Sequence, residues 1–129
     1  MANPSARACV HVPADDLRPG DPTPGMTRRV ALEVEGRWSG LVDTEPHAES
    51  GWHHHGDYES TLYVVRGRMQ LESGPGGLDV VVAGPGDFIH VPSHAVHREV
   101  NPDDAPAQAV IVRCGRGAPT TNVDGPASS

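Results

Sequence analysis

Six of the eight histidines in this 129-residue sequence fall in two clusters, and imidazole is the commonest metal ligand in proteins. The first cluster is the run His53, His54 and His55, within the segment GWHHHGDYE. In a strand, side chains at i and i+2 point the same way, so His53 and His55 can face one ion while His54 points away. A third ligand must come from a distant strand. The second cluster can supply it and consists of His90, His94 and His97.

Three further side chains near these clusters are candidates for chemistry. A carboxylate beside the imidazoles would add negative charge that stabilises a divalent cation, and Glu59 is available for this role. Tyr63 has the same strand parity as Glu59, so it either donates a proton in the pocket or packs. His90 alternates with apolar neighbours in a strand, and it is either a pocket base or a hydrogen-bonded core histidine. The sequence therefore gives Glu59, Tyr63 and His90 as catalytic candidates.

The elements that must position these side chains have the pattern of β-structure. Short β-branched runs alternate with turn-forming Gly, Pro, Asn and Asp residues, and no window has the apolar spacing of a convincing helix. Strands at this spacing indicate a sandwich or small barrel. The predicted strands cover residues 28–35, 61–67, 68–73, 78–83, 87–92 and 107–113.

A proline-rich segment precedes these strands and a segment poor in large apolar residues follows them. We therefore predict an extended N-terminal arm over residues 1–26, one β-domain over residues 27–115 and a flexible tail over residues 116–129.

Charge and hydropathy exclude several classes of function. The net charge of −7 has the wrong sign for nucleic-acid or anionic-membrane partners. No apolar run is long enough to span a bilayer, and the N-terminus lacks the apolar segment of an export signal, so a cytoplasmic location is expected. All ten basic residues are arginine, which rules out Schiff-base chemistry on lysine.

The two histidine clusters resemble the paired motifs of the cupin superfamily, G-x5-H-x-H-x3,4-E-x6-G and G-x5-P-x-G-x2-H-x3-N. In the first motif, His53, His55 and Glu59 fall on the ligand positions. The second is matched in spacing by Gly86, Pro92, His97 and Asn101. The resemblance covers residues from about 40 to 113. It implies an all-β double-stranded β-helix, a jelly roll of two antiparallel sheets. It also implies one divalent metal inside, with His53, His55, Glu59 and His97 as ligands.

The sequence departs from the cupin pattern in three places. His47 and His94 stand where the motifs have glycine, a residue that tolerates unusual backbone angles. Seven residues rather than six separate Glu59 from Gly67, which places Ser60 at the usual glutamate position. Either a bulge lets Glu59 reach the ion, or the site has three histidines and no carboxylate.

Three functions remain open at this point. The resemblance favours a mononuclear non-haem iron dioxygenase, with Fe(II) leaving positions for a small organic substrate and O₂. A non-redox isomerase, cyclase or lyase would instead use Zn, Ni or Mn as a Lewis acid, with Glu59 or His90 moving a proton. The third possibility is a small-ligand-binding protein without catalysis. Strands that are apolar on both sides also indicate a homodimer, in which two jelly rolls pack sheet against sheet.

Overall fold

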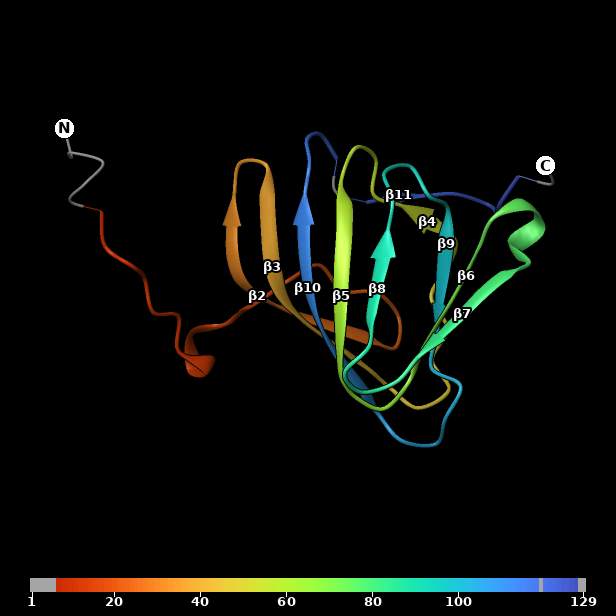
Figure 1. Cartoon of the computed structure of the whole chain (residues 1–129), viewed down its shortest axis with the longest axis horizontal. Coiled ribbons are helices and arrows are strands. Elements are labelled where there is room, and N and C mark those ends of the chain that lie inside the picture. Colours follow the sequence, from red (N-terminus) through yellow and green to blue (C-terminus); the bar gives the residue numbers. More distant parts are fainter. Residues whose placement is uncertain (1–6, 119, 128–129) are drawn as a thin grey trace.

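Two antiparallel β-sheets face one another in the computed structural model, which describes residues 7–118 and 120–127 (Figure 1). The larger sheet contains β1 (Arg18–Pro19), β2 (Met26–Val34), β3 (Arg37–Thr44), β5 (Glu59–Arg66), β8 (Phe88–Val91) and β10 (Ala107–Cys114). The smaller sheet contains β4 (His53–His54), β6 (Met69–Ser73), β7 (Asp79–Ala83), β9 (His97–Val100) and β11 (Thr121–Asn122). Two short 3-10 turns complete the described elements, η2 (Ala14–Asp16) and η3 (Pro75–Gly77).

The strand order explains how distant segments meet. It is β1-β2-β3-β10-β5-β8 in the larger sheet and β11-β4-β9-β6-β7 in the smaller one. The chain passes repeatedly from one sheet to the other, so β4 and β9 become neighbours although more than forty residues separate them. This is the arrangement of a double-stranded β-helix, and the predicted jelly-roll fold is confirmed.

Alternation along the strands divides each sheet into an inner and an outer face. On β5, Ser60, Leu62 and Val64 are buried between the sheets, whereas Glu59 and Tyr63 are exposed. The inner residues of β10 alternate in the same way. Each large aliphatic side chain buried in this core stabilises the fold by about 1.5–3 kcal/mol.

All six predicted runs form strands, but the sequence did not reveal β3. Its inner positions include Gly40, which interrupts the apolar pattern. A Cβ atom at residue 40 would lie 2.2 Å from the carbonyl oxygen of Arg29 on β2. The glycine therefore allows the two strands to approach closely beside the register shift between Val30 and Leu32.

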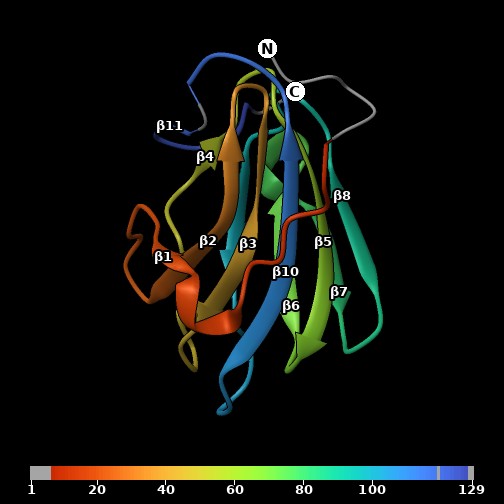
Figure 2. The same ribbon diagram turned by 90° about the vertical axis from the view of Figure 1, so that its left-hand side faces the viewer.

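The predicted arm and tail both contribute short strands. In the arm, β1 pairs with β2, and in the tail, β11 pairs with β4 through Thr121 opposite His54 and Asn122 opposite His53. Figure 2 shows β1 beside β2 and β11 next to β4. Part of the tail therefore lies against the histidine-bearing strand rather than free in solvent. Nowhere in the described chain is there a helix with the length and apolar character needed to cross a bilayer.

The two histidines at the motif glycine positions keep the backbone conformation that glycine favours. His47 and His94 have φ angles of 58° and 60°, and no other non-glycine residue in the described part of the chain has a positive φ. The ring of His94 compensates for part of this cost, since its Nε2 lies 2.8 Å from Oδ1 of Asp57.

Candidate metal centre

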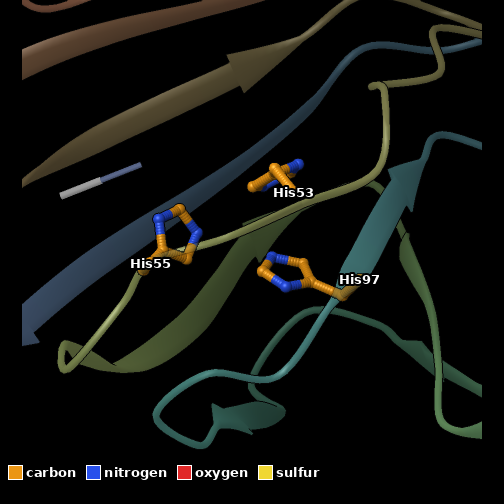
Figure 3. A group of neighbouring side chains, drawn as sticks. All are labelled: His53, His55 and His97. Carbon is orange, nitrogen blue, oxygen red and sulfur yellow. The ribbon is translucent and has the colours of Figure 1, made fainter. Parts of the chain in front are cut away.

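Three buried histidines meet in the space between the two sheets. His53 on β4 lies directly opposite His97 on β9, and His55 follows two residues after His53. One ring nitrogen of each histidine lies within 4.8 Å of the others, and the residues are 4%, 4% and 1% exposed. Figure 3 shows the three rings turned toward one another from the β4 segment and from β9. The convergence of the two histidine clusters is therefore a feature of the fold.

Backbone contacts fix the orientation of two of these rings. Nδ1 of His53 lies 2.9 Å from the carbonyl oxygen of Gly51, and Nδ1 of His97 lies 2.9 Å from that of Ala95. A carbonyl oxygen can only accept a hydrogen bond, so each Nδ1 carries the proton and each Nε2 presents a lone pair. This is the arrangement in which imidazole binds a metal ion.

The two Nε2 atoms have no hydrogen-bond partner in the described part of the chain, although both are buried. An unsatisfied buried polar group costs about 1–3 kcal/mol, so the arrangement needs something to accept these lone pairs. Burial also lowers the pKa of His97, which favours the neutral imidazole that a cation requires. The three histidines thus fit a divalent transition-metal ion.

A carboxylate that the sequence analysis missed lies beside this cluster. Glu99 follows His97 by two residues on β9, so both side chains point inward. The Oε2 atom of Glu99 lies 3.9 Å from Nε2 of His53 and has no hydrogen-bond partner within the described residues. Burial raises the pKa of the Glu99 carboxyl, whereas His97, His53 and the buried arginines Arg28 and Arg113 lower it, and the pKa lies below its ordinary value. The i, i+2 spacing of His97 and Glu99 was the signal that could have revealed this residue.

Two buried arginines stand on the side of the cavity formed by the larger sheet. Arg113 on β10 has Ser60 and Trp38 as its cross-strand neighbours, and its guanidinium lies 5.1 Å from the Trp38 ring. Arg28 on β2 donates a hydrogen bond of 2.6 Å from its guanidinium to Oγ1 of Thr23. Burial and the nearby charge of Arg28 lower the pKa of Arg113 to about 10, and the charge of Glu99 partly offsets this.

Two hollows lie near the histidine cluster, and His97 itself lines the second of them. One of about 490 Å³ is lined by Arg28, Arg113 and Trp38, and also by Gly51 and Thr120 near the histidines. Oγ1 of Thr120 lies 3.5 Å from Nδ1 of His55, so the segment that leads into β11 forms the wall next to the cluster.

The second hollow, of about 410 Å³, opens between β7 and β8. Its lining includes Leu71, Val91 and His97, and His90 lies at its rim.

Comparison with known proteins agrees with this geometry. The model of the family described as Cupin domain matches residues 40–113, more than half of the chain. This chain belongs to the cupin family.

Solved structures that resemble this cupin share its fold at low sequence identity. The polyketide cyclase RemF from Streptomyces resistomycificus has a TM-score of 0.71 at 22% identity, over 91% of this chain and 85% of that one. KdgF from Halomonas sp. has a TM-score of 0.70 at 20% identity, over 85% and 96% of the two chains. Oxalate decarboxylase from Bacillus subtilis has a TM-score of 0.67 at 19% identity, over 79% and 28%. None of the curated protein sequences matches the chain significantly.

The predicted four-ligand set required Glu59 to lie at the histidine cluster, but the structure of this cupin places Glu59 elsewhere. Glu59 is the first residue of β5 and its side chain is 61% exposed on the outer face. Its Oε1 lies 3.6 Å from Nε2 of His90, which is also on the outer face. Ser60 takes the inner position, as its alignment with the family's glutamate position indicated. The extra residue in the spacing moved the carboxylate to the other side of the strand.

The other two catalytic candidates also lie away from the cluster. Tyr63 was correctly assigned the same parity as Glu59, but that parity is the outer one, where its ring lies 5.0 Å from that of Phe88. His90 borders the second hollow, but its side chain is largely exposed and faces Glu59. The structure agrees with the alternatives in which Tyr63 packs and Glu59 is not a ligand, because both residues lie on the outer face of β5.

Proposed function

We propose that this cupin is a mononuclear metalloenzyme that acts on a small organic molecule, with the dioxygenase-like class of oxidoreductase as the activity. The observation that carries the proposal is the pair of buried, unpartnered Nε2 atoms of His53 and His97 beside His55. These three side chains would hold one divalent ion. Fe(II) in that position would supply the redox chemistry of O₂ incorporation.

The residues around the ion have separate roles in this proposal. His53 and His97 are fixed as ligands by the carbonyl groups of Gly51 and Ala95, so their lone pairs are oriented before the ion arrives. Glu99 supplies the negative charge that Glu59 was predicted to supply. The buried walls exclude bulk water, which strengthens every electrostatic interaction in the site.

The positions of the predicted bases favour the dioxygenase class over acid–base chemistry. A non-redox isomerase needs a side chain that moves a proton at the substrate. Glu59 and Tyr63 are on the outer face of the larger sheet, and His90 is only at the rim of the second hollow. Glu99 is on the inner face beside His53 but is buried. The described residues at the centre therefore act chiefly as ligands and positioning groups, which suits chemistry carried by the ion itself.

A Lewis-acid isomerase, cyclase or lyase is the second candidate, and two observations favour it. Glu99 is a carboxylate on the inner face beside His53, and a carboxylate there could act as a general base toward a substrate. In addition, RemF, whose structure is similar over most of this chain, is a polyketide cyclase. Zn, Ni or Mn would serve in that case.

Metal analysis and oxygen uptake test the proposal together. The purified protein is expected to contain one iron per chain and to consume O₂ with members of a panel of small carboxylic acids, enediols and catechols. His97→Ala should lose the metal and the uptake, whereas His90→Ala should keep both. Turnover with Zn or Ni and no O₂ consumption would support the second candidate. Tight substrate binding without turnover would identify a non-catalytic binding protein.

We also propose that the protein is a cytoplasmic homodimer. The support is an apolar patch on the outer face of the larger sheet, formed by Tyr63, Val65, Phe88 and Val112, which are each at least 40% exposed. Packing this outer patch against a second copy would remove apolar side chains from water.

A further inference from the structure

The two buried arginines, Arg28 and Arg113, differ from the arginines that form ion pairs. Nearer the surface, Arg29, Arg66, Arg68 and Arg98 each have a carboxylate within ion-pairing distance. Arg28 and Arg113 are only 8% and 5% exposed, and neither forms an ion pair within the described residues. The charges that are most costly to leave unpaired are therefore the ones without a carboxylate.

Among the described buried residues around these two arginines, positive charge exceeds negative charge. Glu99 is the one buried carboxylate found near these two guanidiniums in the described chain. A divalent ion on the neutral histidines would increase the excess of positive charge. Moreover, Nε of Arg113 is buried and has no hydrogen-bond partner within the described residues. A donor with fixed geometry is thus available for an acceptor that the chain itself does not provide.

Both guanidiniums line the same hollow of about 490 Å³, whose wall also includes Gly51 and Thr120 beside the histidines. The lining contains two acidic residues as well, Asp21 and Glu33, but both are exposed and neither forms an ion pair with either guanidinium among the described residues. Trp38 supports the Arg113 guanidinium from one side, and Thr23 anchors that of Arg28. The guanidinium fork matches the two oxygens of a carboxylate. The volume is sufficient for a small organic molecule.

We propose that this hollow is an organic-anion subsite, in which Arg113 and Arg28 bind the carboxylate of a small organic acid. As a statement about the substrate, this rests on the proposed function: the acid end is held by the arginines while the rest of the molecule extends toward the histidines. As a statement about binding, it depends on the arginines alone. The subsite narrows the substrate class to carboxylic acids and excludes neutral compounds of the same shape.

A matched pair of probes tests the subsite. Cyclohexanecarboxylate and cyclohexanecarboxamide have nearly the same shape but differ in charge, and each is titrated into the full-length protein after removal of metal with a chelator. All basic residues are arginine, so side-chain ¹H–¹⁵N spectra contain at most ten Nε–H signals. The carboxylate is expected to shift the Arg113 signal and to bind at least tenfold more tightly than the amide.

Substitutions separate the subsite from general charge effects. Arg113→Met and Arg28→Met should each weaken binding of the carboxylate at least tenfold, and the backbone amide spectrum shows whether each variant is folded. Arg66→Met is the matched control, because Arg66 is 62% exposed on β5, and its affinity should stay within twofold. The proposal is wrong if the amide binds as tightly, if the carboxylate does not bind at tens of millimolar, or if a folded Arg113→Met or Arg28→Met protein keeps the original affinity.

Repeating the titration with and without Zn²⁺ separates this inference from the proposed function. If the protein takes up no metal but the carboxylate still shifts Arg113, the proposed metalloenzyme fails and the anion subsite stands. If metal binds to the histidines and the carboxylate does not reach Arg113, the subsite fails and the metal centre stands.

Discussion

On strands β5 and β10, the two faces of the larger sheet differ in the side chains that they carry. The inner face includes a buried charged residue, and the outer face includes exposed apolar residues. On β10, Arg113 is buried and points toward the histidines, whereas the preceding residue, Val112, is 42% exposed on the other side. On β5, Ser60 is buried while Tyr63 is exposed and packs on Phe88. Buried charge and exposed apolar surface are both unfavourable in an isolated monomer, so each face indicates an interaction with a partner.

We propose that the two faces serve different partners. The inner face, with the histidines and Glu99 opposite, fits small charged species: a cation and an organic anion. The outer apolar patch fits a macromolecular partner, which we propose is a second copy of the chain. Successive residues of a strand point to opposite faces of the sheet. Glu59 is therefore exposed on the outer face, whereas Ser60, the next residue, is buried on the inner face.

The largest effect on stability is expected from shortening a buried side chain on the inner face. Leu62→Ala removes a side chain that is 2% exposed in the core, and the resulting cavity is expected to lower the free energy of unfolding by about 2–5 kcal/mol. Thr61→Ala, one residue away on the outer face, should change it by less than about 0.5 kcal/mol. Urea denaturation measures both. Equal losses would show that β5 is buried on both sides.

The outer patch is tested by charging it. Val112→Arg places a cation within the exposed apolar surface and is expected to weaken self-association at least a hundredfold, seen as dissociation in sedimentation equilibrium. Leu78→Arg is the control, because Leu78 is 83% exposed beside η3 and lies outside the patch. A monomeric wild-type protein, or a Val112→Arg protein that remains a dimer, would assign this patch to some other role.

An intermediate effect is expected from the two glutamates. Glu99→Gln removes negative charge beside His53, so affinity for the metal should fall by about tenfold. Glu59→Gln changes only the outer face and should leave the affinity within twofold. Competition with a chromophoric chelator measures both constants. A larger loss of metal affinity in Glu59→Gln than in Glu99→Gln would show that Glu59 is the carboxylate of the metal centre.

The smallest effect concerns an exposed ion pair. Arg68 donates two hydrogen bonds to Asp103, which hold the pKa of Asp103 below its ordinary value. Because the folded-state pKa is the lower one, this pair stabilises the fold above the unfolded-state pKa and is lost as the pH falls through the folded-state pKa. Arg68→Met should raise the Asp103 pKa in an NMR titration, with a slight loss of stability at neutral pH that disappears in acid. An unchanged pKa would mean that the pair does not form in solution.

The strand pattern predicted a β-sandwich or small barrel, and the resemblance of the two histidine motifs to those of cupins predicted the jelly roll and the meeting of His53, His55 and His97. Alternation and the two linked motifs are patterns of residues close together in the sequence, so they can be recognised without knowledge of the tertiary structure. The face of β5 was not predictable from alternation alone, because Glu59 and Ser60 alternate equally well with the residues around them. The role of the tail was also missed, since β11 has only two residues and forms through pairing with β4.

Diffraction data collected from one crystal on both sides of the iron, nickel and zinc absorption edges test the central claim most directly. We predict a single anomalous peak between the sheets, about 2.0–2.2 Å from one nitrogen of each of His53, His55 and His97, with Glu59 remote from it. No peak there in protein supplied with metal, or a peak bound between Glu59 and His90 on the outer face, would contradict the account.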